Sequence, residues 1–269
     1  MFLLRSSNHF CTTMPKFSII LSTWNRANIL PKTLTSILNQ TFEDFELLIM
    51  DDGSTDGTGS VLKNFINQDG RVKIFRHEKS RERIISWNEL MKEAKGEWLY
   101  FVDSDDEISY GALEILNHNI NLYPDFKVFN FGQMIYFLGH NYIKEGKELP
   151  DWSGEGMYHF DSGLVGTGGF MFKRECMELM PDIDNVYDFA DWFGAEVNSW
   201  FENNDPDVPH TQYNKDDKFV GNPWGQDNAL MWLVTRKHKS KMLPICVYIA
   251  YVRTENWLYD FNVSSGTMG

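Results

Sequence analysis

Short apolar runs alternate with helical apolar patterns through the first half of the chain. Apolar runs bounded by turn residues indicate buried strands, at 16–22, 45–50, 72–75 and 98–102. Between these runs, apolar residues recur every three or four positions, which predicts helices over 30–38, 61–66 and 84–94. Strands that alternate with helices of this length form βαβ units with right-handed crossovers. We therefore expect an α/β fold with a mostly parallel sheet flanked by helices.

The second half of the chain is less regular. Its pattern predicts helices over 110–122 and 227–237, loops over 139–168, and strands over 127–138, 170–173 and 244–252. We expect a single compact domain with a regular half, residues 15–110, and an irregular half, residues 111–269. Residues 1–14 precede the first strand, and we expect them to be an N-terminal extension, either unstructured or upstream of a natural start at Met14.

Composition excludes several kinds of partner. The 269 residues are 42% hydrophobic and 15% aromatic, which is enough for a sizeable core, and the net charge of −13 disfavours a nucleic-acid backbone as partner. Cys11, Cys176 and Cys246 lack metal-ligand spacing and indicate a reducing compartment. No apolar run approaches the ~18–20 residues of a membrane span. We therefore expect a cytoplasmic protein whose membrane contact, if any, is peripheral.

Two acidic turns directly follow two of the expected strands. Residues 51–56 read DDGSTD and residues 103–106 read DSDD. Open α/β sheets bind their ligands at the carboxyl ends of the strands, where these turns would lie. Carboxylates suit a divalent metal that carries phosphates, because hard cations prefer oxygen ligands. Either turn alone would also fit a helix cap or an acidic surface loop; the order and spacing of both favour a binding site.

Several segments together resemble the opening of family-2 glycosyltransferases. They read FSIILSTWNR at 17–26, LTSILNQTF at 34–42, FELLIMDDGSTD at 45–56 and AKGEWLYFVDSDD at 94–106. The resemblance is dense over residues 16–110 and patchy afterwards. It implies an inverting, nucleotide-sugar-dependent enzyme with a GT-A-type, Rossmann-like sheet. The regular half would then bind the nucleotide sugar, and the irregular half would bind the acceptor and supply the catalytic base.

The resemblance also implies residues that bind the nucleotide-sugar donor. The loop after the first strand would wrap the uracil and ribose through Thr23, Asn25 and Arg26. The acid after the second strand would accept a hydrogen bond from the nucleobase; Asp52 is our choice and Asp51 the alternative register.

Further donor contacts are implied later in the chain. The family commonly carries an arginine where Trp87 stands, so we expect Arg83 to compensate charge instead, although a solvated helix start would explain it as well. Gly168 and Gly169 would let the backbone approach the donor closely, or would form a simple turn.

A metal site and a general base complete the implied machinery. The Asp103-Ser104-Asp105 tripeptide matches the DXD motif of the family, in which the first acid meets ribose or metal and the last binds Mn²⁺ or Mg²⁺. Asp106 is expected to cap the following helix. Asp227 would be the general base that deprotonates the acceptor, although Gln226 replaces the usual glutamate and an N-cap role remains open.

An acidic, aromatic segment at 182–217 has two interpretations. It carries ten acids and one base, and aromatic faces beside carboxylates suit an acceptor cleft for sugars. Trp192, Trp200 and Trp224 would be the acceptor-binding residues. Core packing of a helix would explain the spacing of the first two equally well. The scattered histidines show no zinc-ligand spacing and are expected to be structural or exposed.

We therefore expect a metal-dependent glycosyltransferase, active in polysaccharide biosynthesis. It would move a sugar from a nucleoside-diphosphate sugar, such as a UDP-sugar, to a hydroxyl on a carbohydrate or lipid-linked acceptor. Two alternatives stay open: a metal-dependent phosphohydrolase or nucleotidyltransferase, and a catalytically silent carbohydrate-binding protein. Trp87 and Gln226 depart from the pattern of the family, which is why the catalytically silent alternative stays open.

Overall fold

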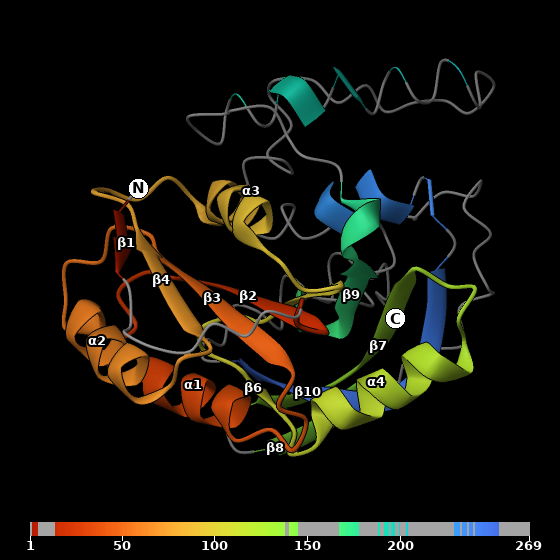
Figure 1. Cartoon of the computed structure of the whole chain (residues 1–269), viewed down its shortest axis with the longest axis horizontal. Helices are drawn as coiled ribbons and strands as arrows, with labels where there is room; N and C mark the ends of the chain where they lie inside the picture. Colours follow the sequence, from red (N-terminus) through yellow and green to blue (C-terminus); the bar gives the residue numbers. More distant parts are fainter. Residues whose placement is uncertain are drawn as a thin grey trace, which may run out of the picture.

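A mixed α/β architecture around one curled sheet is seen in the computed structural model (Figure 1). The structure describes residues 2–4, 14–137, 140–144, 167–177 and 240–252, with further positions between them at 188, 191–193, 195–196, 199, 203, 229–231, 233–235 and 237–238. The strands follow the order β1-β4-β3-β2-β5-β9-β7-β10-β6, and β8 pairs with β7. The expectation of an α/β fold with a largely parallel first half is confirmed.

Four parallel strands form the regular half of the sheet, in the order β4-β3-β2-β5. Their residues are almost entirely buried, as the continuous apolar runs predicted. The strands are β2 (Phe17–Thr23), β3 (Phe45–Asp51), β4 (Val72–Arg76) and β5 (Trp98–Phe101). The connecting helices are α1 (Leu30–Leu38), α2 (Thr58–Gln68) and α3 (Arg83–Glu93).

The helices cover both faces of this sheet. In Figure 1, α1, α2 and α4 (Ala112–Leu122) lie on one face and α3 on the other. The buried side chains accordingly fall into two clusters, one formed with α1, α2 and α4 and one formed with α3. Residues 229–231 and 233–235 are helical, within the expected helix 227–237, and all of them except Thr235 belong to the α3 cluster. Among the described residues, no helix is long and apolar enough to cross a membrane.

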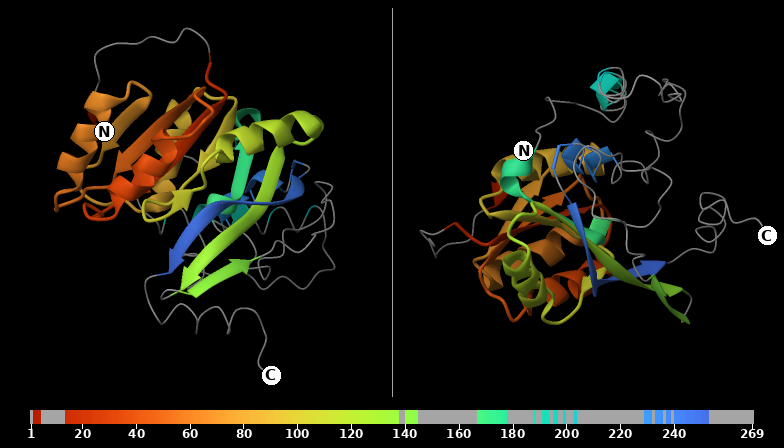
Figure 2. Two further views of the ribbon diagram at one scale, coloured as in Figure 1. Left: turned by 90° about the horizontal axis from the view of Figure 1, so that it is seen from below. Right: turned by 90° about the vertical axis from the view of Figure 1, so that its right-hand side faces the viewer.

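The second half extends the sheet with strands of mixed direction. β9 (Phe170–Lys173) pairs antiparallel with β5, and β7 (Val128–Phe137) pairs antiparallel with β9. β10 (Ser240–Val252) lies parallel to β7, as Figure 2 shows, and the two-residue strand β6 (Glu107–Ile108) pairs antiparallel with it. Short 3₁₀ turns, at Thr167–Gly169 and Arg174–Cys176, flank β9. The pairing of β10 with β6 places β10 beside the acidic segment 103–106, which follows β5.

Three of the differences from the expected elements concern strand pairing. Residues 140–144 were expected in a loop but form β8 (His140–Lys144), because β9 covers only the start of β7 and leaves its later backbone groups to be paired. β1 (Phe2–Leu4) pairs antiparallel with β4, so an unstructured extension is wrong for these residues; the exposed edge of β4 accepts them. β10 begins before Pro244, and its register is irregular directly after Leu243.

Candidate functional site

The carboxyl ends of β2, β3 and β5 lie side by side and bring the two acidic turns to one edge of the sheet. Thr23, the last residue of β2, is in register with Asp51, the last residue of β3. On the other side of β2, the amide of Val102 donates to the carbonyl of Ile20, and Asp103 follows directly. The placement predicted from the apolar runs is therefore confirmed.

Asp51 is part of an internal ion pair. Its side chain is 1% exposed and pairs with Nη1 of Arg76, the last residue of β4. The other carboxylate oxygen, Oδ1, accepts from the amide of Ser54 at 3.0 Å, and Arg76 Nη2 donates to the Ser54 carbonyl at 2.7 Å. Both oxygens of Asp51 therefore hold the turn 51–54 against the end of β4.

Asp52 organises the loop that precedes α3. Its Oδ1 contacts His77 Nδ1 at 2.6 Å and accepts from the amide of Arg81 at 2.9 Å. Its Oδ2 accepts from Ser80 Oγ at 2.6 Å and from the amide of Glu82 at 3.1 Å. Burial opposes ionisation, but these hydrogen bonds outweigh it and hold the pKa of Asp52 below its usual value. A carboxylate accepts about four hydrogen bonds, so a nucleobase donor would have to share or replace one of these partners.

His77 is a site residue that sequence reasoning did not single out. It is buried directly after β4, with Nδ1 on Asp52 and Nε2 on Glu89 Oε2 of α3 at 2.9 Å. Burial lowers its pKa, but the two carboxylates raise it more, to about 9. Arg81 Nη1 also reaches Glu89, at 2.5 Å. The one available signal was its place at the carboxyl end of a predicted strand beside the strand that carries Asp52.

We expect the contribution of His77 to folding stability to fall as pH rises. The pKa of His77 is about 9 when folded and 6.5 as its ordinary value, so its protonated form stabilises the fold fully below pH 6.5. That contribution, on the order of 3 kcal/mol, is lost as pH rises through 9. Urea unfolding of the wild type and of His77→Gln between about pH 6 and about pH 10 measures it.

The difference in unfolding free energy between these two proteins should shrink with rising pH. His118→Gln is the matched control, since His118 is exposed on α4, and its difference from wild type should stay constant. Parallel pH profiles for wild type and His77→Gln would contradict the assignment.

The second acidic turn faces two guanidinium groups. Arg83, the first residue of α3, places Nη1 3.2 Å from Asp103 Oδ1 and lies over the ring of Trp87 at 4.8 Å. Arg26, in the loop after β2, places Nη2 3.4 Å from Asp105 Oδ2. The Asp103 and Asp105 side chains are each about a quarter exposed. The fold thus brings together four of the residues expected in the donor and metal sites.

The donor set of this turn suits a hard divalent cation. No group of three or more acids, histidines or cysteines among the described residues forms a metal cluster. Two carboxylates nevertheless match the way Mg²⁺ is often held, by one or two acids together with substrate phosphates and water. Asp103 and Asp105 therefore fit an ion that arrives with a diphosphate.

The loop after β2 is braced by its own polar groups. Asn25 has a positive φ of 51°, and its Oδ1 accepts from the amides of Thr55 and Asp56 at 2.8 and 3.3 Å. The amide of Asn25 donates to Ser54 Oγ at 2.9 Å. Thr23 Oγ1 is buried without a hydrogen-bond partner among the described residues. Asn25 therefore joins the two loops, whereas the hydroxyl of Thr23 remains available for a ligand or water.

Asp106 does not cap the following helix, contrary to the expectation. Helix α4 begins at Ala112, after Gly111. Asp106 instead accepts from Tyr248 Oη and from the amide of Tyr251, each at 2.8 Å. Burial raises the pKa of Asp106 well above its usual value, and the nearby charges of the turn add to this. The pairing of β6 with β10 places Tyr248 and Tyr251 beside Asp106, and the local sequence could not indicate this pairing.

The other predicted residues are placed as follows. Gly168 and Gly169 are buried in the 3₁₀ turn before β9, and Tyr100 Oη donates to the Gly168 carbonyl at 3.2 Å. Trp192 is partly buried and packs against the α3 core cluster, beside buried Phe193. Trp200, Trp224 and Asp227 lie outside the described residues, so their roles stay predictions.

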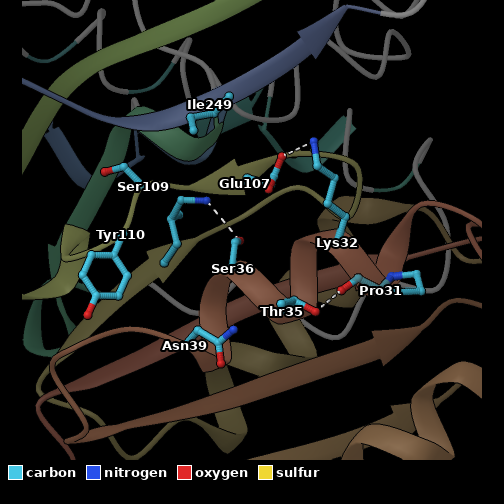
Figure 3. Close-up of a pocket in the computed structure, with 10 residues that line it drawn as sticks. Pro31, Lys32, Thr35, Ser36, Asn39, Glu107, Ser109, Tyr110 and Ile249 are labelled. Atoms are coloured by element: carbon cyan, nitrogen blue, oxygen red, sulfur yellow. Dashed lines mark hydrogen bonds and ion pairs between the residues drawn. The ribbon is translucent and has the colours of Figure 1, made fainter.

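A groove of about 530 Å³ runs along the flank of α1 (Figure 3). Its walls come from α1, from β6 and the residues after it, and from Ile249 of β10. Lys32 and Glu107, which line the groove, pair at 2.5 Å, and the Tyr251 hydroxyl contacts both of them, with Lys32 Nζ at 2.8 Å. None of the predicted donor-site residues lines this groove. The contacts among Lys32, Glu107 and Tyr251 join α1 to β6 and β10.

The sequence matches a known family and its members. The profile of glycosyl transferase family 2 matches residues 18–152, about half of the chain. The GalNAc(5)-diNAcBac-PP-undecaprenol beta-1,3-glucosyltransferase of Campylobacter jejuni is 35% identical over 192 residues, which make up 70% of this chain and 59% of that protein. The matched part of the chain covers 14–59% of the length of this and seven other curated relatives.

Solved structures share the fold. S. aureus TarS 1–349 in complex with UDP-GlcNAc matches with a TM-score of 0.61 and 18% identity, over 93% of this chain and 64% of that chain. The mannosyltransferase PcManGT from Pyrobaculum calidifontis in complex with GDP-Man and Mn²⁺ matches with a TM-score of 0.57 and 13% identity, over 94% of this chain and 61% of that chain. This likeness shows the fold alone, which is the GT-A type.

Proposed function

The chain belongs to glycosyl transferase family 2, and we propose that it transfers a sugar from a nucleoside-diphosphate sugar to a hydroxyl acceptor. One observation carries the proposal. Arg26, in the loop after β2, and Arg83, at the start of α3, converge on the partly exposed carboxylates of Asp105 and Asp103, at the carboxyl edge of the sheet. Cations and carboxylates interleaved in this way suit a diphosphate that binds together with a divalent ion.

The leaving group determines what the site must stabilise. When the bond between sugar and diphosphate breaks, negative charge grows on the diphosphate oxygens. Arg26 and Arg83 would bind these oxygens and hold the donor in line with the acceptor. Asp103 and Asp105 would hold Mn²⁺ or Mg²⁺, and that ion, when bound, neutralises charge on the leaving diphosphate. A UDP-sugar is the proposed donor, in keeping with the UDP-GlcNAc bound by TarS.

Asp227 is the proposed general base. It would take the proton from the acceptor hydroxyl, whose oxygen then attacks the anomeric carbon from the face opposite the diphosphate, with inversion of configuration. The helical residues 229–231 and 233–235 support this role, because they anchor the expected helix in the core cluster that also contains α3.

A lipid-linked carbohydrate is the proposed acceptor. The name of the Campylobacter jejuni relative describes a substrate in which a carbohydrate is joined through a diphosphate to undecaprenol. An acceptor of this kind would place the reaction at a membrane surface and within the synthesis of a surface glycan or polysaccharide. The chain itself would need only peripheral contact with that surface.

Thermal unfolding with a panel of nucleotides tests the proposal. UDP, GDP, dTDP and CMP are each added with and without Mn²⁺, because a ligand that binds only the folded state raises the melting temperature. We expect one nucleoside diphosphate, UDP, to raise it in a Mn²⁺-dependent manner, and incubation of the matching nucleotide sugar with acceptor to release that diphosphate. Release of inorganic phosphate or pyrophosphate would instead indicate phosphoryl chemistry, and binding without turnover would indicate a silent protein.

A further inference from the structure

Strand β10 carries a buried tyrosine whose hydroxyl lies inside the acidic turn. Tyr248 is 1% exposed, and its Oη accepts from the amide of Asp103 at 3.1 Å and donates to Asp106 Oδ2 at 2.8 Å. A single hydroxyl thus joins the first and last acids of the turn, from a position 142 residues further along the chain than Asp106.

The ring of Tyr248 has little freedom to move. Its backbone is paired with Ile108 of β6, which directly continues the acidic segment. On the other side, the ring fills the space beside Gly168, where a Cβ atom would lie 1.8 Å from the nearest ring atom. A hydroxyl held by strand pairing and close packing keeps a fixed position, as a supporting group must if it is to orient ligands.

A second contact from β10 holds the same turn. The amide of Tyr251 donates to Asp106 Oδ1 at 2.8 Å, while its hydroxyl contacts Glu107 and accepts from Lys32 of α1 at 2.8 Å. Asp106 therefore has a partner on each carboxylate oxygen. The carboxylates of the turn repel one another, so fixed partners are needed to keep Asp103 and Asp105 directed toward a ligand.

We propose that Tyr248 is a positioning residue, whose hydroxyl sets the orientation of the Asp103–Asp106 turn and thereby the affinity of Asp103 and Asp105 for a divalent ion bound with a nucleoside diphosphate. The inference rests on the proposed function and extends it from the first half of the chain to β10. Tyr248 itself touches no substrate; it acts through the amide of Asp103 and the carboxylate of Asp106.

The Tyr248→Phe variant tests this inference, since it removes the hydroxyl and keeps the ring against Gly168. Tyr100→Phe is the matched control: Tyr100 is also fully buried, and the hydroxyl hydrogen bond that it would lose goes to the Gly168 carbonyl and not to the turn. Two quantities are measured for each protein. One is the affinity for Mn²⁺ in the presence of UDP, from the paramagnetic resonance signal of free Mn²⁺. The other is amide hydrogen exchange over residues 102–107.

For Tyr248→Phe we expect Mn²⁺ affinity to fall about tenfold, as for other residues that orient metal ligands, and exchange of the 102–107 amides to accelerate. Both variants should unfold at a lower urea concentration than the wild type, Tyr248→Phe more so because it loses two hydrogen bonds and not one, and Tyr100→Phe should keep wild-type Mn²⁺ affinity. A purely structural role would lower stability without this difference in affinity.

Unchanged exchange, or unchanged Mn²⁺ affinity, in Tyr248→Phe would overturn the inference. A wild-type protein that binds no nucleoside diphosphate with any divalent ion would overturn the proposed function and, with it, the ligand-orienting role. Accelerated exchange in that case would still leave Tyr248 as a structural support of the turn, so the two failures are distinguishable.

Discussion

Sugar transfer by an Asp105→Asn protein is expected to be at least about a hundredfold slower than transfer by the wild type. The substitution keeps the size of the side chain but removes one of the two carboxylates that would hold the divalent ion. A hundredfold change corresponds to about 2.7 kcal/mol of transition-state stabilisation, which is within the range for one electrostatic contact to a leaving group. Initial rates of nucleoside-diphosphate release from the donor identified by the nucleotide panel measure the effect.

The fold should survive this substitution. Asp105 is about a quarter exposed, and its ion pair with Arg26 spans 3.4 Å, so the loss of that pair should cost less than about 1 kcal/mol of stability. Asp125→Asn is the matched control, because Asp125 is exposed just before β7, at the opposite edge of the sheet, and should transfer at the wild-type rate. A folded Asp105→Asn protein with an undiminished rate would refute the role of Asp105.

Replacing Gly53 by alanine is expected to destabilise the protein by about 3 kcal/mol or more. Gly53 has a φ of +74°, a conformation that costs a side-chain-bearing residue about 1–2 kcal/mol. A Cβ atom there would also lie 2.5 Å from the carbonyl carbon of Lys79 and 2.6 Å from the amide nitrogen of Ser80. Backbone atoms cannot move aside as the end of a flexible side chain can, so the loop 79–82 would be displaced from Asp52.

Urea unfolding measures this loss, and Gly57→Ala serves as its control. Gly57 lies four residues later and has a negative φ of −72°. Among the described residues, a Cβ atom there would meet only the methyl group of Ala27, at 3.4 Å. Its replacement should change stability by less than about 1 kcal/mol. Equal unfolding free energies for the two variants would show that the turn 51–54 does not pack against the loop 79–82 as described.

The sequence determined the regular half of the fold and the place of the candidate site. Continuous apolar runs at 45–50 and 98–102 indicated buried strands, and each ended in acids. Right-handed crossovers then placed both strand ends at one edge, so the meeting of the two acidic turns followed from local pattern and topology alone. The irregular half was predicted less well: β8 was missed and β10 began earlier than expected, because their pairing depends on neighbouring strand edges.

Only the tertiary structure decided what each acid contacts. Adjacent Asp51 and Asp52 have the same local sequence context, yet one pairs with Arg76 and the other with His77 and the loop before α3. The raised pKa of His77 requires two carboxylates from different elements, and Tyr248 reaches the second turn from β10. These contacts join residues between 12 and 145 positions apart. These contacts depend on strand register and helix orientation, which the periodicity of the sequence does not encode. Strand ends and turns depend on residues close together in the sequence, and the local pattern therefore predicts them.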